Sequence, residues 1–396
     1  MNADALAACE SRARTSGVLS RLPTASRWRP ANRLLDMLQG RDVVLYGAGR
    51  GFFTFQRFCL QKMGVEARLV VDRRFDGHGR FAGRPSCGPQ ALLAEAPWAR
   101  EAAVFITIGD AAVRAEIADR LEANGFRFVF SAYDVYEYHT HYTPAGLLQD
   151  IGGHIRSHAE EIERAFALFA HDAASQRIFA AVLGTYADGV ADVPASPYRE
   201  QYFPSDLPMA CDLSRYISCG AFTGDTVEQA RRHVGRMQAV ACFEPDPGNF
   251  AALTAYLSQH SDQIADMLFS FPCGLHRSNQ RLRFSSAHST NSSIDPAGDA
   301  VVHCVALDQV LFNFRPTYLT MDIEGAELDA LAGARETLRR HRPELALSAY
   351  HCVDHLWRLP LFVDRLGVGY RLYLRNYSGM VSETVLYAST QRSDRP

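Results

Sequence analysis

The chain has 396 residues, of which 47% are hydrophobic and 21% are charged, and this composition is typical of a folded globular protein. Its formal net charge of −3 gives no overall basic field, so nucleic acid is not an expected partner. No apolar run approaches the roughly 20 residues that a membrane span needs, and the length suggests two to three domains.

The first 36 residues are rich in Arg and Ser and are expected to form an N-terminal arm, since they lack the uninterrupted apolar core of a signal peptide. Nine cysteines are spread along the chain without a C-x-x-C pair, and several lie within apolar, strand-like runs. Buried, reduced thiols are the simplest interpretation of this pattern. The sequence therefore favours a cytoplasmic protein.

Residues 37–147 alternate between strand and helix patterns. A strand, a glycine turn and a helix are predicted over 41–64, a second strand from 66 that ends at 72, and another strand, turn and helix over 102–126. Strands that alternate with helices indicate a parallel sheet. We therefore expect a small, doubly wound, Rossmann-like domain.

The first turn of this domain contains Gly47, Gly49 and Gly51, while Phe52 stands where the dinucleotide fingerprint has its last glycine. Asp72, at the end of the second strand, could accept hydroxyls of a ribose. The ligand would then be NAD or a nucleotide sugar. The alternative is a degenerate domain that serves dimerisation or substrate docking.

Residues 148–200 are predicted to be a helical connector. Apolar residues recur at three- and four-residue spacing over 157–170 and 175–189, which is typical of amphipathic helices. The two histidines of the preceding segment, His139 and His141, are interpreted as part of a polar connection rather than as metal ligands.

Residues 201–396 form the second α/β unit. Its predicted strands are 215–220, 238–245, 265–274, 317–323, 344–350, 370–375 and 383–389. Its predicted helices are 225–235, 247–260, 326–341 and 353–366. The last two strands follow one another without a helix, which predicts an antiparallel hairpin at the end of an otherwise parallel sheet.

The turn after the first strand of this unit has the features of a cofactor loop. Gly220 and Gly224 flank it, and glycine lets the backbone approach a ligand closely. Asp225 or Thr226 can cap the helix that follows. Glu244 ends the next strand, where a carboxylate can accept both hydroxyls of a ribose. The loop and this acid together predict a nucleoside-binding site.

Asp322, Glu324 and Glu327 place three carboxylates within six residues at the end of a later strand. Asp322 and Glu324 fall on one side of an extended stretch. They could orient a cofactor amine, hold a divalent cation such as magnesium, or take a proton from a hydroxyl. Glu327 alone is explained by its place in the first turn of a helix.

These segments together resemble the FkbM family of S-adenosylmethionine-dependent methyltransferases, over about residues 201–389. The motifs that carry the resemblance are "YISCGAFTGDTV", "ACFEPDPGNF", "YLTMDIEGAELDALAGA", "RPELALSAYH" and "YRLYLRNYSGMVSETVLYA". The resemblance implies a class I methyltransferase fold, with a seven-stranded sheet that ends in a reversed hairpin. It also implies O-methylation of a hydroxyl on a sugar, a glycan or a natural product.

By position, the resemblance assigns cofactor binding to Ser218, Gly220, Ala221, Gly224, Asp225, Thr226, Glu244, Asn249 and Asp322. It assigns catalysis to Asp322, Glu324 and His351, and places Thr290 to Ser293 near the adenine or the substrate. His351 is a candidate general base because the pKa of histidine lies near working pH. The alternative is a strand-end histidine bonded to backbone.

Ser218 departs from the family pattern, which has an acid at this position. Serine can accept a hydrogen bond but supplies no charge for the cofactor's amino-acid end, and Asp322 or Asp225 could replace that charge. Two other functions therefore stay open. One is an oxidoreductase or epimerase that acts through the N-terminal domain, and the other is a non-catalytic scaffold. The expected partner is a small-molecule or glycan hydroxyl acceptor, and the chain is compatible with a homodimer.

Overall fold

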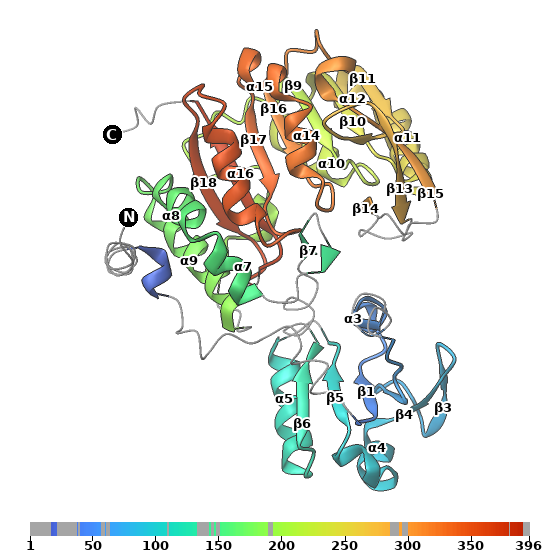
Figure 1. Ribbon diagram of the computed structural model, residues 1–396. Helices are drawn as coiled ribbons and strands as arrows, with labels where there is room; N and C mark the ends of the chain where they lie inside the picture. The colour runs from blue at the N-terminus through green and yellow to red at the C-terminus, as the bar shows by residue number, and fades with distance from the viewer. Residues whose placement is uncertain are drawn as a thin grey trace, which may run out of the picture. The chain divides into compact units, whose positions relative to one another are not determined.

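The computed structural model describes residues 17–21, 38, 40–56, 60, 64–108, 111–132, 142–143, 146–147, 151–188, 193–285, 293–294, 300–379 and 381–390. The chain divides into two compact units, whose elements are labelled in Figure 1. The N-terminal unit contains Pro23–Ser157 and Gly184–Ala191. The C-terminal unit contains His158–Leu183 and Asp192–Pro396, together with the short 3-10 helix η1 (Val18–Arg21).

The N-terminal unit is built on a six-stranded sheet. Its strands are β1 (Val43–Tyr46), β2 (Leu69–Val71), β3 (His78–Phe81), β4 (Arg84–Cys87), β5 (Ala103–Ile106) and β6 (Phe128–Ser131). Its helices are α3 (Arg50–Phe55), α4 (Pro89–Glu95), η5 (Pro97–Arg100), α5 (Ala111–Ala123) and α7 (Ile151–Ser157), and the pair β7 (Tyr142–Thr143) and β8 (Gly146–Leu147) stands apart. The strand order is β3-β4-β2-β1-β5-β6, and only β3 runs antiparallel to its neighbour.

The central strands β1, β2 and β5 are buried on both faces, as their continuous hydrophobic residues predict. Val43 and Leu45 pack with Phe52 of α3 in one cluster, whereas Val44 and Tyr46 belong to a cluster on the opposite face. Successive side chains of β1 therefore serve two cores, because they point to opposite faces of the sheet. The predicted α/β architecture is confirmed, although the β3–β4 hairpin was not predicted.

The C-terminal unit contains a seven-stranded sheet. Its strands are β9 (Arg215–Cys219), β10 (Met237–Phe243), β11 (Ala265–Phe271), β16 (Tyr318–Met321), β17 (Glu344–Ser348), β18 (Arg371–Asn376) and β19 (Thr384–Ser389). The order is β11-β10-β9-β16-β17-β19-β18, with β19 antiparallel to both of its neighbours and the other pairs parallel. This confirms the class I methyltransferase-like sheet and its terminal hairpin.

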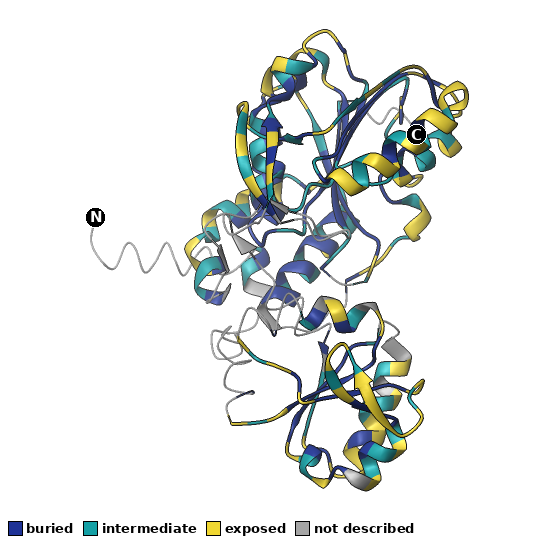
Figure 2. Ribbon diagram, turned by 90° about the vertical axis from the view of Figure 1, so that its right-hand side faces the viewer, coloured by how far each residue is buried: buried dark blue, intermediate teal, exposed yellow. Residues whose placement is uncertain are grey.

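Helices cover this sheet, and its strands are largely buried (Figure 2). The helices are α8 (Ala159–Ala167), α9 (Ala173–Asp188), η6 (Tyr198–Glu200), α10 (Asp225–Val234), α11 (Pro247–Gln259), α12 (Ser261–Ile264), α13 (Leu307–Val310), α14 (Glu327–Ala332), α15 (Arg335–His341) and α16 (His355–Asp364). Val227 and Ala230 of α10 and Leu253 of α11 pack with Tyr216 and Val240 of the sheet. Since β9 to β11 are parallel, the turns that enter α10 and α11 lie at the same edge of the sheet.

Two details differ from the sequence prediction. The segment 274–305 adds a four-stranded sheet, β12-β15-β13-β14, made of β12 (Gly274–Leu275), β13 (Gln280–Ser285), β14 (Ser293–Ile294) and β15 (Ala300–Val305). The single helix predicted over 326–341 is split into α14 and α15. The split falls at Gly333, where an added Cβ would lie only 2.2 Å from the carbonyl oxygen of His276, so the two backbones meet there.

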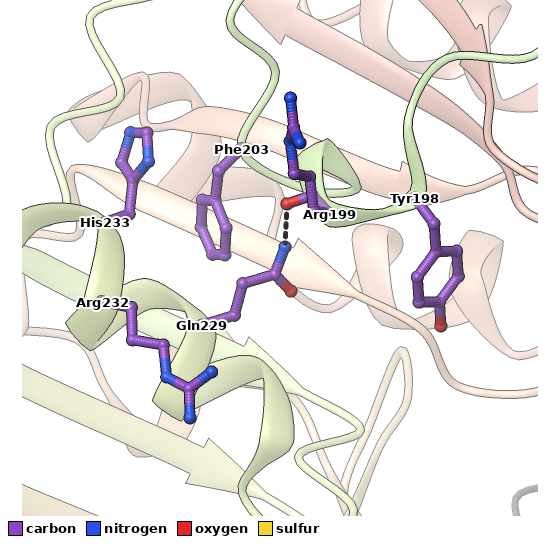
Figure 3. A pocket seen from close by; sticks show the side chains of 6 residues that line it. All are labelled: Tyr198, Arg199, Phe203, Gln229, Arg232 and His233. Atoms are coloured by element: carbon purple, nitrogen blue, oxygen red, sulfur yellow. Dashed lines mark hydrogen bonds between the residues drawn. The ribbon is translucent and has the colours of Figure 1, made fainter.

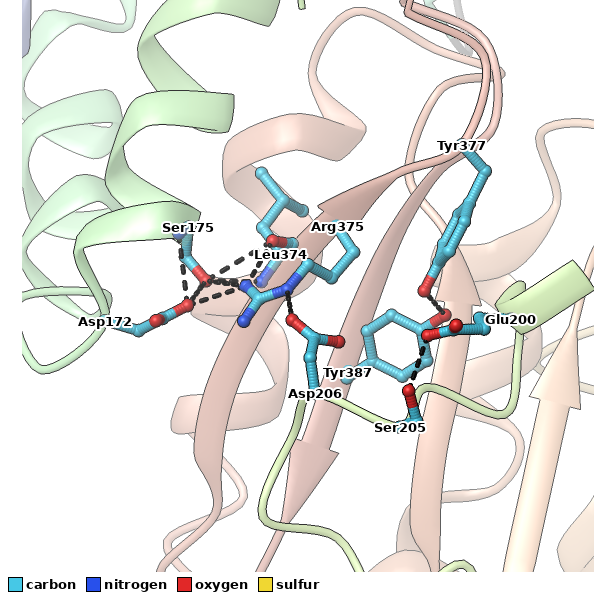
Figure 4. Close-up of polar contacts among 9 residues, drawn as sticks. All are labelled: Asp172, Ser175, Glu200, Ser205, Asp206, Leu374, Arg375, Tyr377 and Tyr387. Carbon is cyan, nitrogen blue, oxygen red and sulfur yellow. Dashed lines mark hydrogen bonds and ion pairs between the residues drawn. The ribbon is translucent and has the colours of Figure 1, made fainter. Parts of the chain in front are cut away.

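The predicted connector does not stand apart, because residues 158–183 group with the C-terminal unit. Figure 4 shows one of the contacts that hold α9 against β18. The guanidinium of Arg375 donates to Asp172 at 2.7 Å and to Asp206 at 2.6 Å, and Ser175 lies 3.2 Å away. Arg375 is buried, so this pairing neutralises a charge that would be costly to bury alone. Among the described helices, none combines the length and apolarity needed to cross a membrane.

Candidate active site

The first feature at the carboxyl edge of the large sheet is the glycine loop after β9. Gly220 has φ +77° and, with Ala221, donates its backbone N–H to the carbonyl of Phe243 at 3.0 Å. A Cβ on Gly220 would lie 1.9 Å from the carbonyl oxygen of Asp322. Glycine is therefore required here first by the close approach of the β9 and β16 ends.

The loop ends at Gly224, which has φ +97° and is the N-cap of α10, so the prediction that Asp225 or Thr226 caps this helix is wrong. An added Cβ would lie 2.6 Å from the ring of Tyr256, so α11 also presses on this turn. Asp225 and Thr226 are the first two residues of α10, and the side chain of Asp225 is exposed at the helix N-terminus. An N-terminus of this kind favours negative charge and offers free backbone N–H groups.

Glu244 stands immediately beyond β10 and orders the same loop. One carboxylate oxygen accepts the N–H of Phe222 at 2.9 Å, and the other accepts the N–H of Asp246 at 2.9 Å. Burial raises the pKa of Glu244 to about 6. Because a carboxylate has about four acceptor positions, it retains capacity for the hydroxyls of a ligand. Asn249 lies nearby, in the first turn of α11.

Asp322, at the end of β16, is surrounded by donors. It accepts the hydroxyl of Tyr202 at 2.5 Å and that of Tyr350 at 3.4 Å, and Nε2 of His351 lies 3.1 Å away. Burial opposes ionisation, but the hydrogen bond and charge of His351 outweigh it and lower the pKa of Asp322. Asp322 is therefore an ionised, tightly held carboxylate.

Glu324 is two residues further on and differs in both backbone and charge. Its φ of +54° puts a non-glycine residue in the left-handed region, a strained conformation that is concentrated at functional sites. One carboxylate oxygen lies 3.6 Å from Nε2 of His351, and its side chain is still 27% exposed. Burial, with the charges of Asp322 and Glu327, raises the pKa of Glu324 to about 8. Glu324 thus exchanges its proton near neutral pH and remains accessible.

His351 lies between these acids. Its Nδ1 is 2.8 Å from Glu327, and its Nε2 faces Asp322 and Glu324. Burial alone would lower the pKa of His351, but the neighbouring carboxylates raise it well above its ordinary value. The ring is therefore an imidazolium, and the expectation of a base poised near working pH does not hold. A cation between Asp322 and Glu324 would have to displace this positive charge.

Two residues of this cluster were not assigned to the site from the sequence. Glu327 is fully buried and bonds His351, although its place in a first helical turn seemed explanation enough. Tyr202 belongs to the segment before β9, has φ +69°, and donates its hydroxyl to Asp322. Neither role could be read from spacing, because each depends on a partner more than 20 residues away.

Ser218 does not lie on the loop surface. It is 1% exposed within β9, and alternation places it on the same face as Tyr216, in the core beneath α10. An acid at this position would be a buried charge. With serine at this position, the chain therefore lacks a buried acid beneath the loop and not an exposed one.

The corresponding turn of the N-terminal unit is closed by its own residues. Asp72 accepts the N–H of Ala48 at 2.7 Å and is paired with the guanidinium of Arg74 at 2.9 Å. Arg74 also donates to the carbonyl of Ala48 at 2.8 Å. The acid expected to meet a ribose is thus already engaged with an arginine that follows it in the same turn.

A separate cavity of about 390 Å³ lies on the outer side of α10 (Figure 3). It is lined by Tyr198, Arg199, Phe203, Gln229, Arg232 and His233. Phe203 stacks on His233 with ring centroids 5.7 Å apart, and the two guanidinium groups point away from one another. None of the residues predicted for the active site lines this cavity.

Some predicted positions lie outside the described residues, namely His139, His141 and Thr290 to Ser292. Ser293 is the first residue of β14. Within the described part, the structure brings the glycine loop, Glu244, Asp322, Glu324 and His351 to one edge of one sheet.

Comparison with known proteins bears on this arrangement. Residues 218–372 match the model of the methyltransferase FkbM domain. A crystal structure of a methyltransferase FkbM from Methylobacillus flagellatus KT superposes with a TM-score of 0.72 and 20% identity, covering 94% of this chain and 97% of that one. At this identity, the likeness establishes the shared fold.

A second structure is fibrillarin from Aeropyrum pernix in complex with natively bound S-adenosyl-L-methionine, at 10% identity and a TM-score of 0.29, covering 45% of this chain and 66% of that one. At a TM-score of 0.29, nothing about the present chain is inferred from this structure. The search of curated proteins found no match to this chain. The family match begins at Ser218 in β9 and ends in β18, so it includes Gly220, Glu244, Asp322, Glu324 and His351. The C-terminal unit of this chain therefore carries a methyltransferase domain of the FkbM family.

Proposed function

We infer that this protein is an S-adenosylmethionine-dependent O-methyltransferase that acts on a hydroxyl of a sugar, a glycan or a natural product. The observation that carries the proposal is the meeting of a glycine loop, a ribose-type acid and a proton-exchanging acid at one sheet edge. Glu244 and the loop come from β10 and β9, and Glu324 comes from the end of β16. A methyl transfer needs these functions side by side.

The residues present fit the cofactor. Glu244 would hold its ribose hydroxyls, because each oxygen already accepts one backbone N–H and keeps further acceptor capacity. The loop from Gly220 to Gly224 and the N-terminus of α10 would line its methionine side. Asp322, ionised and fixed by Tyr202, would supply the charge that Ser218 lacks. When bound, the cofactor supplies the methyl group from its sulfonium.

Glu324 is the proposed general base. Its side chain is 27% exposed, and its pKa of about 8 matches proton exchange near neutral pH. The oxygen of the acceptor hydroxyl would form a bond to the methyl carbon as the carbon–sulfur bond of the cofactor breaks and S-adenosylhomocysteine leaves, and the hydroxyl proton would pass to the Glu324 carboxylate. The imidazolium of His351, 3.6 Å away, stabilises that carboxylate in its ionised form before the transfer.

The test is transfer of a radiolabelled methyl group from S-adenosylmethionine to a panel of sugars and hydroxylated natural products. Glu324→Gln should lower the rate about 100-fold or more, with the affinity for the cofactor unchanged. Glu336→Gln is the matched control, because Glu336 is an exposed acid of the same unit with a side chain that is 78% exposed. Full activity of Glu324→Gln would remove Glu324 as the base. Absence of cofactor binding by the intact protein would favour the non-catalytic alternative.

A further inference from the structure

A second cluster of metal-ligating side chains lies behind the active site, at the start of α16. Cys352, Asp354 and His355 each offer one ligand atom, and these atoms lie within 4.8 Å of one another. All three residues are buried, with His355 completely inaccessible. A thiol, a carboxylate and an imidazole within four residues follow one another in the turn that leaves the sheet after β17.

Within the described part of the chain, several polar atoms in and beside this cluster lack hydrogen-bond partners. Among the described residues, neither ring nitrogen of His355 nor Oδ1 of Asp354 has a hydrogen-bond partner. The same holds for Oε2 of Glu327, which lies 3.3 Å from Nδ1 of His355. Buried polar atoms are nearly always satisfied, so several that converge at one place call for an explanation.

The neighbouring cations engage only one oxygen of each carboxylate. Glu327 and Asp354 bring two carboxylates next to a thiol and an imidazole. Arg358 neutralises Asp354 from one side, at 2.8 Å from Oδ2, and His351 bonds the other oxygen of Glu327. Oδ1 of Asp354 and Oε2 of Glu327 are therefore left without a hydrogen-bond partner among the described residues, and Oε2 of Glu327 lies beside His355.

We propose that Cys352, Asp354 and His355 form a structural zinc site, with Glu327, which lies beside His355, as a candidate fourth ligand. Sulfur, nitrogen and carboxylate oxygen together are ligands that Zn²⁺ accepts in tetrahedral sites. With Zn–N and Zn–O bonds of about 2.0–2.1 Å, two such ligand atoms lie about 3.3 Å apart. The distance between Nδ1 of His355 and Oε2 of Glu327 is 3.3 Å.

This site is distinct from the trio of Asp322, Glu324 and His351. In that trio the imidazole of His351 is hydrogen-bonded through Nδ1 to Glu327. Neither ring nitrogen of His355 has a hydrogen-bond partner in the described part of the chain, so the ring is available to a metal. A zinc ion here would tie α16 to α14, directly behind the catalytic edge.

The direct test measures metal content. The full chain is produced in zinc-supplemented medium, passed through a desalting column and analysed by inductively coupled plasma mass spectrometry. We expect about one zinc per chain, and at least about a tenfold lower content in Cys352→Ser and His355→Gln. Cys242→Ser, which alters another buried thiol of the same unit, is the matched control and should retain the metal.

A second measurement keeps the test decisive if a variant does not fold. The intact protein is stripped with a chelator and loaded with Co²⁺, whose thiolate charge-transfer absorption in the near ultraviolet reports a cysteine ligand. Zinc well below one-tenth per chain in the intact protein, with no such absorption on cobalt loading, would overturn the proposal. So would loss of the metal from Glu324→Gln, because the ion would then lie at the catalytic edge.

Discussion

Both units place a glycine turn after their first strand and an acid at the end of the next strand, but only one of the two turns is left open. In the N-terminal unit, Asp72 is engaged by the N–H of Ala48 and by the guanidinium of Arg74. In the C-terminal unit, Glu244 accepts two backbone N–H groups, and no described arginine or lysine forms an ion pair with it. The same sequence pattern thus gives an acid that is paired with a neighbouring arginine in one unit and an acid without a described arginine partner in the other.

The difference lies in a single residue that the fingerprint does not include. Arg74 follows Asp72 by two positions, and its side chain folds back onto the acid and the turn. A charge-assisted pair of this kind lowers the pKa of Asp72, despite its burial, and occupies its oxygens. After Glu244, the corresponding position is Asp246, which caps α11 instead. A nucleotide site is therefore better judged from what else contacts the acid than from the glycines.

The largest expected effect concerns the glycines of the two turns. Gly220→Ala should destabilise the protein by about 3 kcal/mol or more, because it combines a left-handed backbone with a Cβ 1.9 Å from a carbonyl oxygen. Gly49→Ala, at φ −94° with open space around it, should change stability by about 0.5 kcal/mol or less. Denaturant unfolding measures both, and equal losses would contradict this account of the turns.

The next effect concerns the acids. Glu244→Ala should raise the dissociation constant of S-adenosylmethionine about 100-fold, because it removes charged hydrogen bonds to the ligand and loosens the loop at Phe222. Asp72→Ala should leave that constant within about twofold, since Asp72 serves its own turn. Calorimetric titration of the two variants side by side provides the measurement. Weak binding in both would mean that the turns are coupled.

A smaller, graded effect is expected from pH. Burial raises the pKa of Glu244 to about 6, and the ionised form is the one that accepts ligand hydroxyls. Affinity for the cofactor should therefore be complete above about pH 7 and fall as pH is lowered through 6, approaching tenfold per pH unit. The profile should be nearly flat in Glu244→Gln. An unchanged profile in that variant would show that another group is titrating.

Much of the fold follows from local patterns in the sequence. Strand and helix periods are set by residues within a few positions of each other, so the alternation of elements and the terminal hairpin could be predicted. The carboxyl ends of parallel strands meet at one edge, so Gly220, Glu244 and Asp322 could be placed together as well. The split between α14 and α15 could not, because it arises where Gly333 meets the distant backbone of His276.

What the sequence by itself determined is therefore the order of the elements and the edge at which their functional groups meet, since both depend on short-range periodicity and strand direction. Only the tertiary structure decided the state of those groups. In the folded chain, Asp72 is paired with Arg74, and His351 lies among three carboxylates. Glu327 is buried between His351 and His355. Charge and protonation depend on burial and on partners brought from other elements, and contacts of that range leave no periodic trace in the chain.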